Sequence, residues 1–170
     1  QVRLNFPASS DTISTSKYAS ELIIEEIQEK GYKNIVIIGL THISVRLLNS
    51  IKNLDKDISY FIIEEDEEKI EEFIFERDEH LIVGDPRESI VLSKANIKEA
   101  DLVINMNSQI GVSILITKRT RDLNPDCKII SRIFSENIAD IISKSPFKSE
   151  VISSSKTTLK NMIKHHMLDF

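Results

Sequence analysis

The sequence predicts a doubly wound α/β domain with a parallel six-stranded sheet. Three observations support this fold class. Short aliphatic runs recur along the chain, they are apolar throughout rather than alternating with polar residues, and each is followed by a stretch with helical periodicity. Strands without alternation are buried on both faces, as in a parallel sheet that is covered by helices. A chain of 170 residues, 41% of them hydrophobic, is long enough for one such domain with an additional arm.

The first part of the chain is predicted to lie outside the sheet. Residues 7–16 (PASSDTISTS) are polar and aperiodic, which is typical of a linker. Apolar residues recur at helical spacing over residues 16–30, and Gly31 follows as a helix stop. We therefore assign residues 1–31 to a linker plus an extra amphipathic helix.

From residue 32 on, strands and helices alternate. The strands are predicted at residues 34–39, 58–64, 81–85, 101–105, 127–131 and 150–153. The helices are predicted at residues 42–53, 66–76, 88–96, 108–123, 135–144 and 155–168. Pro125 cannot continue a helix, so the helix that precedes it is expected to stop before Asn124. The sheet domain is thus predicted to span residues 32–153, and the last helix lies in residues 154–170.

The composition limits the classes of partner and compartment. The net charge of −5 and the sequence pI of about 5.4 argue against a nucleic-acid partner, since such proteins usually carry a basic face. One cysteine, Cys127, cannot form an internal disulfide, which agrees with a reducing compartment but is also what chance would give. No apolar run approaches the roughly 18 residues of a membrane helix, so we expect this segment to be soluble.

The carboxyl end of the first strand carries the most informative motif. NIVIIGLTHIS (34–44) begins like the turn of a Rossmann-like nucleotide site, where glycines make the turn, admit the pyrophosphate and let the helix pack closely. Gly39 fills the first position, but Thr41 and Ser44 stand at the other two. Thr41 would put a branched side chain where phosphate oxygens approach, although its hydroxyl and the helix N-terminus favour an anion. The sequence of this turn is about equally consistent with a turn that binds a nucleotide and with one that binds none.

The carboxyl end of the second strand supplies a candidate ribose ligand. Glu64 lies there, about 20 to 25 residues after the glycine turn, where an acidic residue commonly binds ribose hydroxyls. The run EEDEEKIEE (64–72) contains so many acids that one had to fall at this position, and a helix dipole favours acids in its first turn. The acids other than Glu64 are therefore interpreted as a solvated helix start.

No pattern predicts a metal site or a catalytic centre. The acidic run lacks the alternating oxygen ligands of a calcium loop. His165 and His166 are adjacent, so on a helix they point about 100° apart and cannot share a metal. Cys127 has no CxxC partner and is interpreted as a small core residue. We therefore expect a binding domain rather than an enzyme.

Two longer stretches resemble a known family. GDPRESIVLSKANIKEADLVI (84–104) joins a Gly-Asp strand end, a helix and a strand, and RDLNPDCKIISRI (121–133) places an Arg-x-Leu-Asn-Pro turn before a strand that closes with Arg. Together they resemble the RCK N-terminal domain, also called the TrkA-N domain, of potassium channels and potassium-uptake systems. The resemblance runs in register over about residues 33–152 and is nearest in pattern to the archaeal calcium-gated potassium channels.

The resemblance implies a cytoplasmic regulatory domain that senses a ligand and gates a potassium channel in the plasma membrane. Such domains form homodimers that assemble into larger rings, and the helix in residues 154–170 would be the crossover, or dimerisation, helix. In nucleotide-binding members the ligand is NAD(H) or an adenine nucleotide, bound at the strand ends. The positions that the resemblance and the turn assign to ligand contact are Gly39, Thr41, His42, Ser44, Glu64, Asp85 and Asn105. The acids that hold calcium in the archaeal channels correspond to Asn105, Arg132 and Phe134, so no calcium site is implied.

Two other functions use the same fold. A nucleotide-binding regulatory subunit of a potassium-uptake system is expected to keep an intact nucleotide loop, which Thr41 weakens. The cofactor domain of an NAD-dependent oxidoreductase needs a substrate domain with catalytic groups, and none follows before Phe170. The helix at residues 16–30 is either a connector from a pore or an earlier domain, or a helix that packs on the edge of the sheet.

Overall fold

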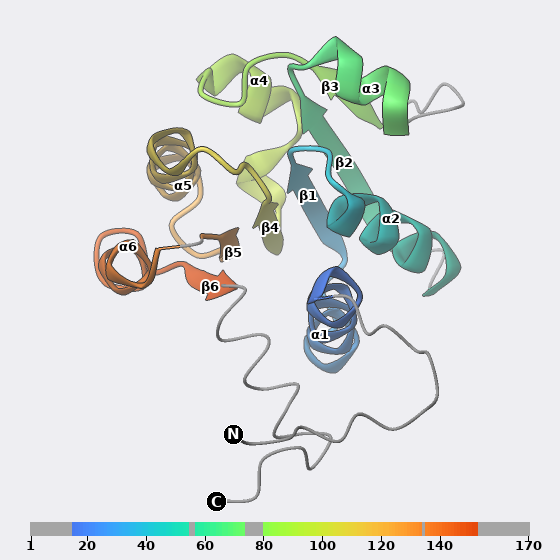
Figure 1. Cartoon of the computed structure of the whole chain (residues 1–170), viewed down its shortest axis with the longest axis horizontal. Helices are drawn as coiled ribbons and strands as arrows, with labels where there is room; N and C mark the ends of the chain where they lie inside the picture. Colours follow the sequence, from blue (N-terminus) through green and yellow to red (C-terminus); the bar gives the residue numbers. More distant parts are fainter. Residues whose placement is uncertain (1–14, 55–56, 74–79, 134, 153–170) are drawn as a thin grey trace, which may run out of the picture.

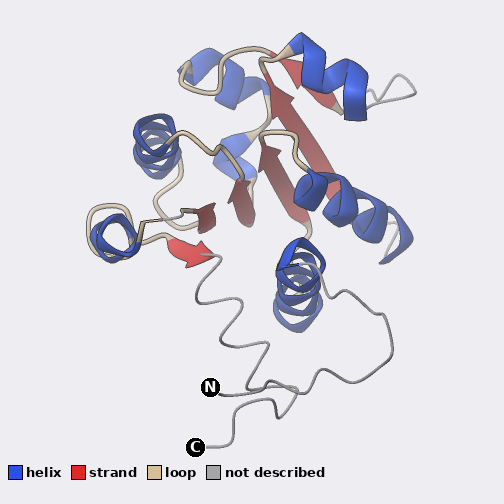
Figure 2. Ribbon diagram, viewed as in Figure 1, coloured by secondary structure: helices blue, strands red, loops and turns tan. Residues whose placement is uncertain are grey.

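The structure, a computed structural model, describes residues 15–54, 57–73, 80–133 and 135–152. Within them, six parallel strands form one sheet in the order β3-β2-β1-β4-β5-β6 (Figure 1). Figure 2 shows the helices on both faces of this sheet. The strand order reverses between β1 and β4 at the centre, so the predicted doubly wound, Rossmann-like fold is confirmed.

Each predicted strand is present, with ends that differ by one or two residues. The strands are β1 (Asn34–Ile38), β2 (Ser59–Glu64), β3 (Leu81–Val83), β4 (Leu102–Asn105), β5 (Lys128–Arg132) and β6 (Glu150–Ile152). The helices are α1 (Thr15–Lys30), α2 (His42–Leu54), α3 (Glu67–Phe73), α4 (Ser89–Lys94), η1 (Ile97–Glu99), α5 (Ile110–Leu123) and α6 (Glu136–Ile142). The predicted helix at 88–96 is too long, because Asn96 takes a left-handed conformation (φ 55°) between α4 and η1. The linker before residue 15 and the helix predicted at 155–168 lie outside the described residues.

β1 shows why the strands are apolar throughout. Ile35 and Ile37 belong to the core between the sheet and the helices α1 and α2, whereas Val36 and Ile38 belong to the core on the side of α4 and α5. Each fully buried aliphatic side chain contributes about 1.5–3 kcal/mol. Both faces of the strand therefore favour aliphatic residues, and the alternation of a half-exposed strand is missing.

α1 packs on a face of the sheet rather than on its edge. Right-handed crossovers place α2 and α3 on one face, over β1, β2 and β3, and the later connections on the other, which leaves half of the first face open. α1 covers this half: Ile23 and Ile27, both 1% exposed, share a core cluster with Leu102 of β4 and Ile130 of β5. In Figure 1 it lies beside α2. The extra helix is therefore part of the same packed unit as the sheet.

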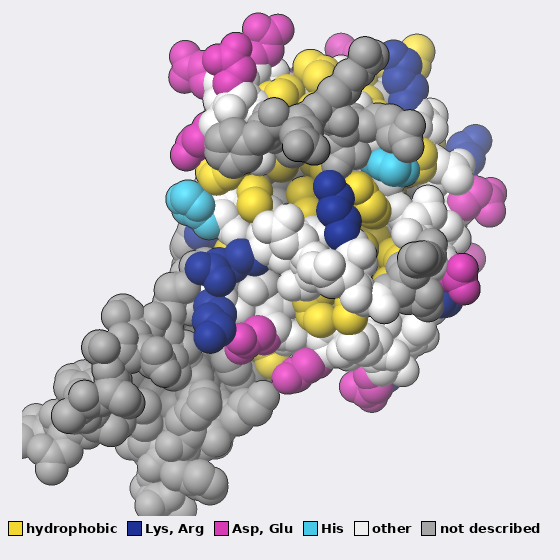
Figure 3. Space-filling view, turned by 90° about the vertical axis from the view of Figure 1, so that its right-hand side faces the viewer, with side chains coloured by type: hydrophobic (Ala, Val, Ile, Leu, Met, Phe, Trp, Pro, Cys, Tyr) yellow, Lys and Arg dark blue, Asp and Glu magenta, His cyan; other side chains and the backbone are white. Residues whose placement is uncertain are grey.

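The surface of the described part is mixed in charge. Figure 3 shows one face, on which acidic side chains lie mostly near the margins and Lys or Arg side chains are interspersed with hydrophobic ones. Among the described residues, no helix is long and apolar enough to cross a bilayer.

Candidate functional site

The candidate site lies at the carboxyl ends of β1 and β4, where the strand order reverses. Gly39 follows β1 with a φ of +92°, a conformation that residues with a Cβ rarely adopt. A Cβ at this position would lie 3.4 Å from both the Asn107 nitrogen and the Met106 carbonyl carbon. Glycine is therefore favoured at position 39 by the backbone conformation, and a Cβ there would be in van der Waals contact with the segment after β4.

The hydroxyls of Thr41 and Ser44 close the turn from within. Ser44 donates its hydroxyl to the Gly39 carbonyl (2.6 Å), so the 3.0 Å contact between the two hydroxyls has Thr41 as donor and Ser44 as acceptor. Thr41 directly precedes α2 and accepts the Ser44 N–H (3.2 Å), as a helix-capping threonine does. Ser44 is fully buried and takes the place of the glycine that lets the helix pack closely. The turn is thus satisfied internally where a phosphate would otherwise be bound.

Glu64 holds the same turn from the side of β2. Its side chain is 4% exposed, and one carboxylate oxygen accepts the Leu40 N–H at 2.6 Å. The other oxygen accepts the N–H groups of Glu65 (2.9 Å) and Asp66 (3.0 Å). An ionised carboxylate has about four acceptor positions. Three are occupied, so about one is left for a hydroxyl of a ligand.

Asn105 supports the segment after β4 from behind. It is 0% exposed, and its Oδ1 accepts the Asn107 N–H (3.2 Å). Its Nδ2 donates into α5, to the carbonyl and the hydroxyl of Ser113 (both 3.0 Å) and to the Thr117 hydroxyl (3.3 Å). Asn105 therefore positions the backbone that faces Gly39, and in this arrangement its amide is not presented to a ligand.

Asp85 forms an ion pair with Arg87, a residue that the sequence patterns did not mark as a candidate. Arg87 donates its backbone N–H and its Nε to Asp85 Oδ1 (both 2.8 Å), and its Nη2 lies 2.8 Å from Oδ2. These hydrogen bonds hold the pKa of Asp85 below its usual value. Arg87 Nη2 also lies 3.6 Å from Glu65, so it links the turns after β3 and β2. The sequence signal that could have predicted this ion pair was an Asp two residues before an Arg in a turn.

The remaining candidate groups lie at the rim or far from the site. His42 is the first residue of α2, and its ring packs edge-on against Phe73 of α3, with centroids 5.1 Å apart. Cys127 directly precedes β5, at the opposite end of the sheet, and burial raises the pKa of its thiol to about 11. In the described ranges, no group of three His, Cys, Asp or Glu side chains is placed to hold a metal ion.

A hollow of about 720 Å³ lies at the opposite, amino ends of β4 and β5. Polar groups in its walls are engaged in the fold. Arg121 donates to the carbonyls of Pro125 (2.6 Å) and Cys127 (2.8 Å), and Asp101 accepts the Lys33 N–H (2.9 Å). Ligands of doubly wound sheets bind at the carboxyl ends of the strands. The turns after β1, β2 and β3, together with the segment after β4 that faces Gly39, are called the strand-end site below and remain the candidate.

The fold and this site define a Rossmann-like α/β domain whose strand-end turn is closed by its own side chains. The family model of the TrkA-N domain matches residues 35–154, so the chain belongs to the TrkA-N family. This confirms the resemblance that the sequence motifs indicated. No curated protein sequence gives a significant match.

Three solved structures illustrate the fold. The TrkA-N domain of the inner membrane protein YbaL from Escherichia coli is 19% identical with a TM-score of 0.64, over 79% of this chain and 96% of that one. The GsuK RCK domain is 22% identical with a TM-score of 0.60, over 79% of this chain and 29% of that one. The Kef CTD of Shewanella denitrificans in AMP-bound form is 15% identical with a TM-score of 0.58, over 78% of both chains. This chain thus spans under a third of the GsuK chain.

Proposed function

We propose that the chain is a cytoplasmic ligand-sensing domain of a potassium-transport protein, and that it binds an adenine nucleotide at the strand-end site. One observation carries this proposal: Glu64 is buried at the end of β2, holds the turn after Gly39, and keeps about one acceptor position for a hydroxyl. An acid at this place accepts the ribose hydroxyl in Rossmann-like sites. GsuK bound to NAD, GsuK bound to ADP and the AMP-bound Kef CTD, all similar in fold, support the ligand class.

The turn favours a mononucleotide over NAD(H). The pyrophosphate of a dinucleotide passes the second glycine position, which is Thr41 in this chain. There the Thr41 hydroxyl already donates to the Ser44 hydroxyl, and the Ser44 N–H already donates to the Thr41 hydroxyl oxygen. The pyrophosphate of a dinucleotide is fixed by a ribose at each end and would have to displace these bonds, whereas the phosphates of AMP or ADP are fixed at one end only and could extend toward solvent.

The proposed output is regulation of transport rather than catalysis. Ligand binding would bias the arrangement of paired domains in a homodimer or a larger ring, and so act on a pore or transport subunit in the plasma membrane. Membership of the TrkA-N family and the similarity to the GsuK RCK domain, the Kef CTD and YbaL support an association with membrane transport. The helix predicted in residues 154–170 would form the dimer contact. A regulatory subunit of an uptake system has the same support from the fold, but Thr41 alters the loop that it would need.

A thermal-melting titration tests the ligand. The full chain is melted with AMP, ADP, ATP, NAD or NADH, and at least one adenine nucleotide is expected to raise the melting temperature. A ligand at 100 times its Kd stabilises the folded state by about 2.7 kcal/mol. Glu64→Gln should abolish the rise, because one of the two acceptor oxygens becomes an NH2 donor, so the side chain can no longer accept the three N–H groups and a ligand hydroxyl together. Glu68→Gln, in the exposed first turn of α3, is the matched control and should leave the rise intact.

Two outcomes would contradict the proposal. The nucleotide assignment is wrong if none of the five compounds shifts the melting of the unsubstituted chain, or if Glu64→Gln keeps the full rise. Sedimentation tests the dimer separately: the chain is expected to be at least dimeric, and a monomer at every concentration would exclude pairing through this segment.

A further inference from the structure

Small polar side chains cross the buried core between α5 and the β4–β5–β6 half of the sheet. Each is 2% exposed or less, and together we call them the polar row: Asn105, Ser113, Thr117, Ser131 and Ser149. From Asn105, the contacts pass to the Thr117 hydroxyl (3.3 Å), from there to the Ser131 hydroxyl (3.2 Å), and on to the Ser149 hydroxyl (2.9 Å). The polar row thus joins the end of β4 to the start of β6.

The hydroxyl protons of the polar row fit one consistent arrangement. Thr117 donates to the Ser113 carbonyl at 2.8 Å, so its contact with Ser131 has Ser131 as the donor. Ser149 in turn donates to Ser131 at 2.9 Å, with the Ile129 carbonyl as a longer alternative at 3.3 Å. The hydroxyl donors therefore point from β6 toward α5, whereas Asn105 Nδ2 donates to Thr117 from the β4 side, so the contacts converge on Thr117. The aligned hydroxyl bonds from Ser149 to Thr117 polarise one another, and Asn105 joins them through the Thr117 oxygen, which accepts from both Asn105 and Ser131.

One end of the polar row lies at the strand-end site, and the other end lies at β6. At one end, Asn105 accepts the Asn107 N–H, and that nitrogen would touch a Cβ on Gly39, so this end is part of the wall of the strand-end site. At the other end, Ser149 leads into β6, the edge strand after which the chain continues beyond the described residues.

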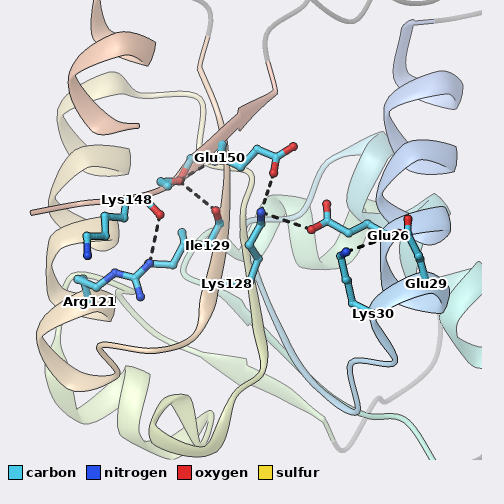
Figure 4. Close-up of polar contacts among 10 residues, drawn as sticks. Glu26, Glu29, Lys30, Arg121, Lys128, Ile129, Lys148 and Glu150 are labelled. Atoms are coloured by element: carbon cyan, nitrogen blue, oxygen red, sulfur yellow. Dashed lines mark hydrogen bonds and ion pairs between the residues drawn. The ribbon is translucent and has the colours of Figure 1, made fainter. Parts of the chain in front are cut away.

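β6 is also tied to the helix before the sheet. Figure 4 shows Lys128 of β5 between Glu150 of β6 and Glu26 of α1, with its Nζ 2.7 Å and 3.4 Å from the two carboxylates. The lysine side chain is 33% exposed, so this contact is partly shielded from water. β6, at the far end of the polar row, is therefore linked through Lys128 to α1, the helix that precedes the sheet in the chain.

We propose that the polar row couples the strand-end site to β6, so that a ligand that shifts the segment after β4 changes how firmly β6 is held. An apolar α5 would pack on this sheet without the cost of burying hydroxyls, and in the polar row hydrogen bonds offset that cost. The ligand part of this inference rests on the proposed function. The coupling between the two ends stands on the contacts alone.

Amide hydrogen exchange on the full chain tests the coupling without ligand. Thr117→Val keeps the side-chain shape and removes the middle of the polar row, and Ser149→Ala removes its far end. Both should speed exchange at Asn107 and in β6 by at least about threefold relative to amides of β1, as for coupled positions in one network. The control is Thr120→Val, on the same buried side of α5, whose hydroxyl has no partner among the described residues. It should leave both regions within about twofold.

The possible outcomes distinguish the coupling between the two ends of the polar row from its response to a bound nucleotide. Coupling is overturned if Ser149→Ala leaves Asn107 unchanged, and this variant decides the matter alone if Thr117→Val does not fold. With ADP at saturation, β6 should gain protection in the unsubstituted chain and in Thr120→Val but not in Thr117→Val. Equal gains in all three would overturn the regulatory part. If no nucleotide raises the melting temperature, the proposed function fails, while exchange without ligand still decides the coupling.

Discussion

Asn124→Asp should destabilise the fold by about 3–5 kcal/mol at neutral pH. Asn124 directly follows α5 and is buried. Its Nδ2 donates to the carbonyls of Ile97 (2.8 Å), Lys98 (3.1 Å) and Ala100 (3.0 Å), and its Oδ1 accepts the Cys127 N–H (3.0 Å). One side chain thus ties the end of α5 to η1 and to the start of β5.

The magnitude follows from what the substitution removes. The amide loses two N–H groups, each worth about 1–1.5 kcal/mol, and a carboxylate oxygen then faces three carbonyl oxygens. A buried charge without a partner costs about 3–5 kcal/mol. Urea unfolding followed by circular dichroism should show a midpoint lower by about 1–2.5 M, given a slope of about 2–3 kcal/mol/M. Asn53→Asp is the control: Asn53 is exposed on α2 with one bond, from Nδ2 to the Asn49 carbonyl, and should change stability by less than about 0.5 kcal/mol.

The destabilisation caused by Asn124→Asp should be smaller at acidic pH. Burial and the facing carbonyls raise the pKa of the introduced carboxyl in the folded state above that of the unfolded chain, near ~3.9. The penalty is therefore small below the unfolded pKa and grows as the pH rises through the folded one. An equal loss at about pH 5 and about pH 7, or a loss under about 0.5 kcal/mol at neutral pH, would refute the reasoning.

Three further perturbations test other parts of the structure. Gly39→Ala should lower the free energy of unfolding by about 1–2 kcal/mol, because φ is +92° there, and urea unfolding measures it. Asp85→Asn should remove stability that the unsubstituted chain has above the ordinary carboxyl pKa of 3.8 and loses as the pH falls through its lowered folded pKa, so the two chains should converge in strong acid. Cys127 should resist iodoacetamide near pH 8 until urea unfolds the chain, since burial raises the pKa of its thiol to about 11; rapid alkylation of the folded chain would contradict this.

The sheet was predictable because its strands are buried on two sides. Runs such as residues 35–38 have to be aliphatic at every position when α1 and α2 cover one face and α4 and α5 the other. The place of α1 was not predictable. Ile23 and Ile27 would recur at the same helical spacing whether the helix packed on this sheet, on its edge or on another domain, since periodicity gives a face but no partner.

The places of the candidate residues at the strand ends were predictable, but their hydrogen bonds were not. The spacing from Gly39 located Glu64, yet the bond from the Leu40 N–H to its carboxylate depends on how two strands lie side by side. Asn105 marked a strand end correctly, but its burial follows from α5 packing over it. Ser and Thr residues at helical spacing occur on solvent-exposed helix faces and on buried ones, so their spacing alone does not tell the two apart. On α5 the face is buried, and its hydrogen-bond partners, such as Ser131, come from strands distant in the sequence.

The motifs that carry the family resemblance build the scaffold, which explains why they identify the fold better than the ligand. Arg121 and Asn124, from one motif, bind backbone carbonyls around the end of α5. In the other, a Cβ on Gly84 would lie 2.9 Å from a methyl carbon of α4, so glycine is needed for this helix to approach β3. The strand-end turn is instead shaped by Thr41 and Ser44, which depart from the glycine pattern. The proposed function therefore predicts that nucleotide preference depends on these two hydroxyls. Replacing both with glycine should move the preference from mononucleotide toward dinucleotide, as competitive melting titrations would show.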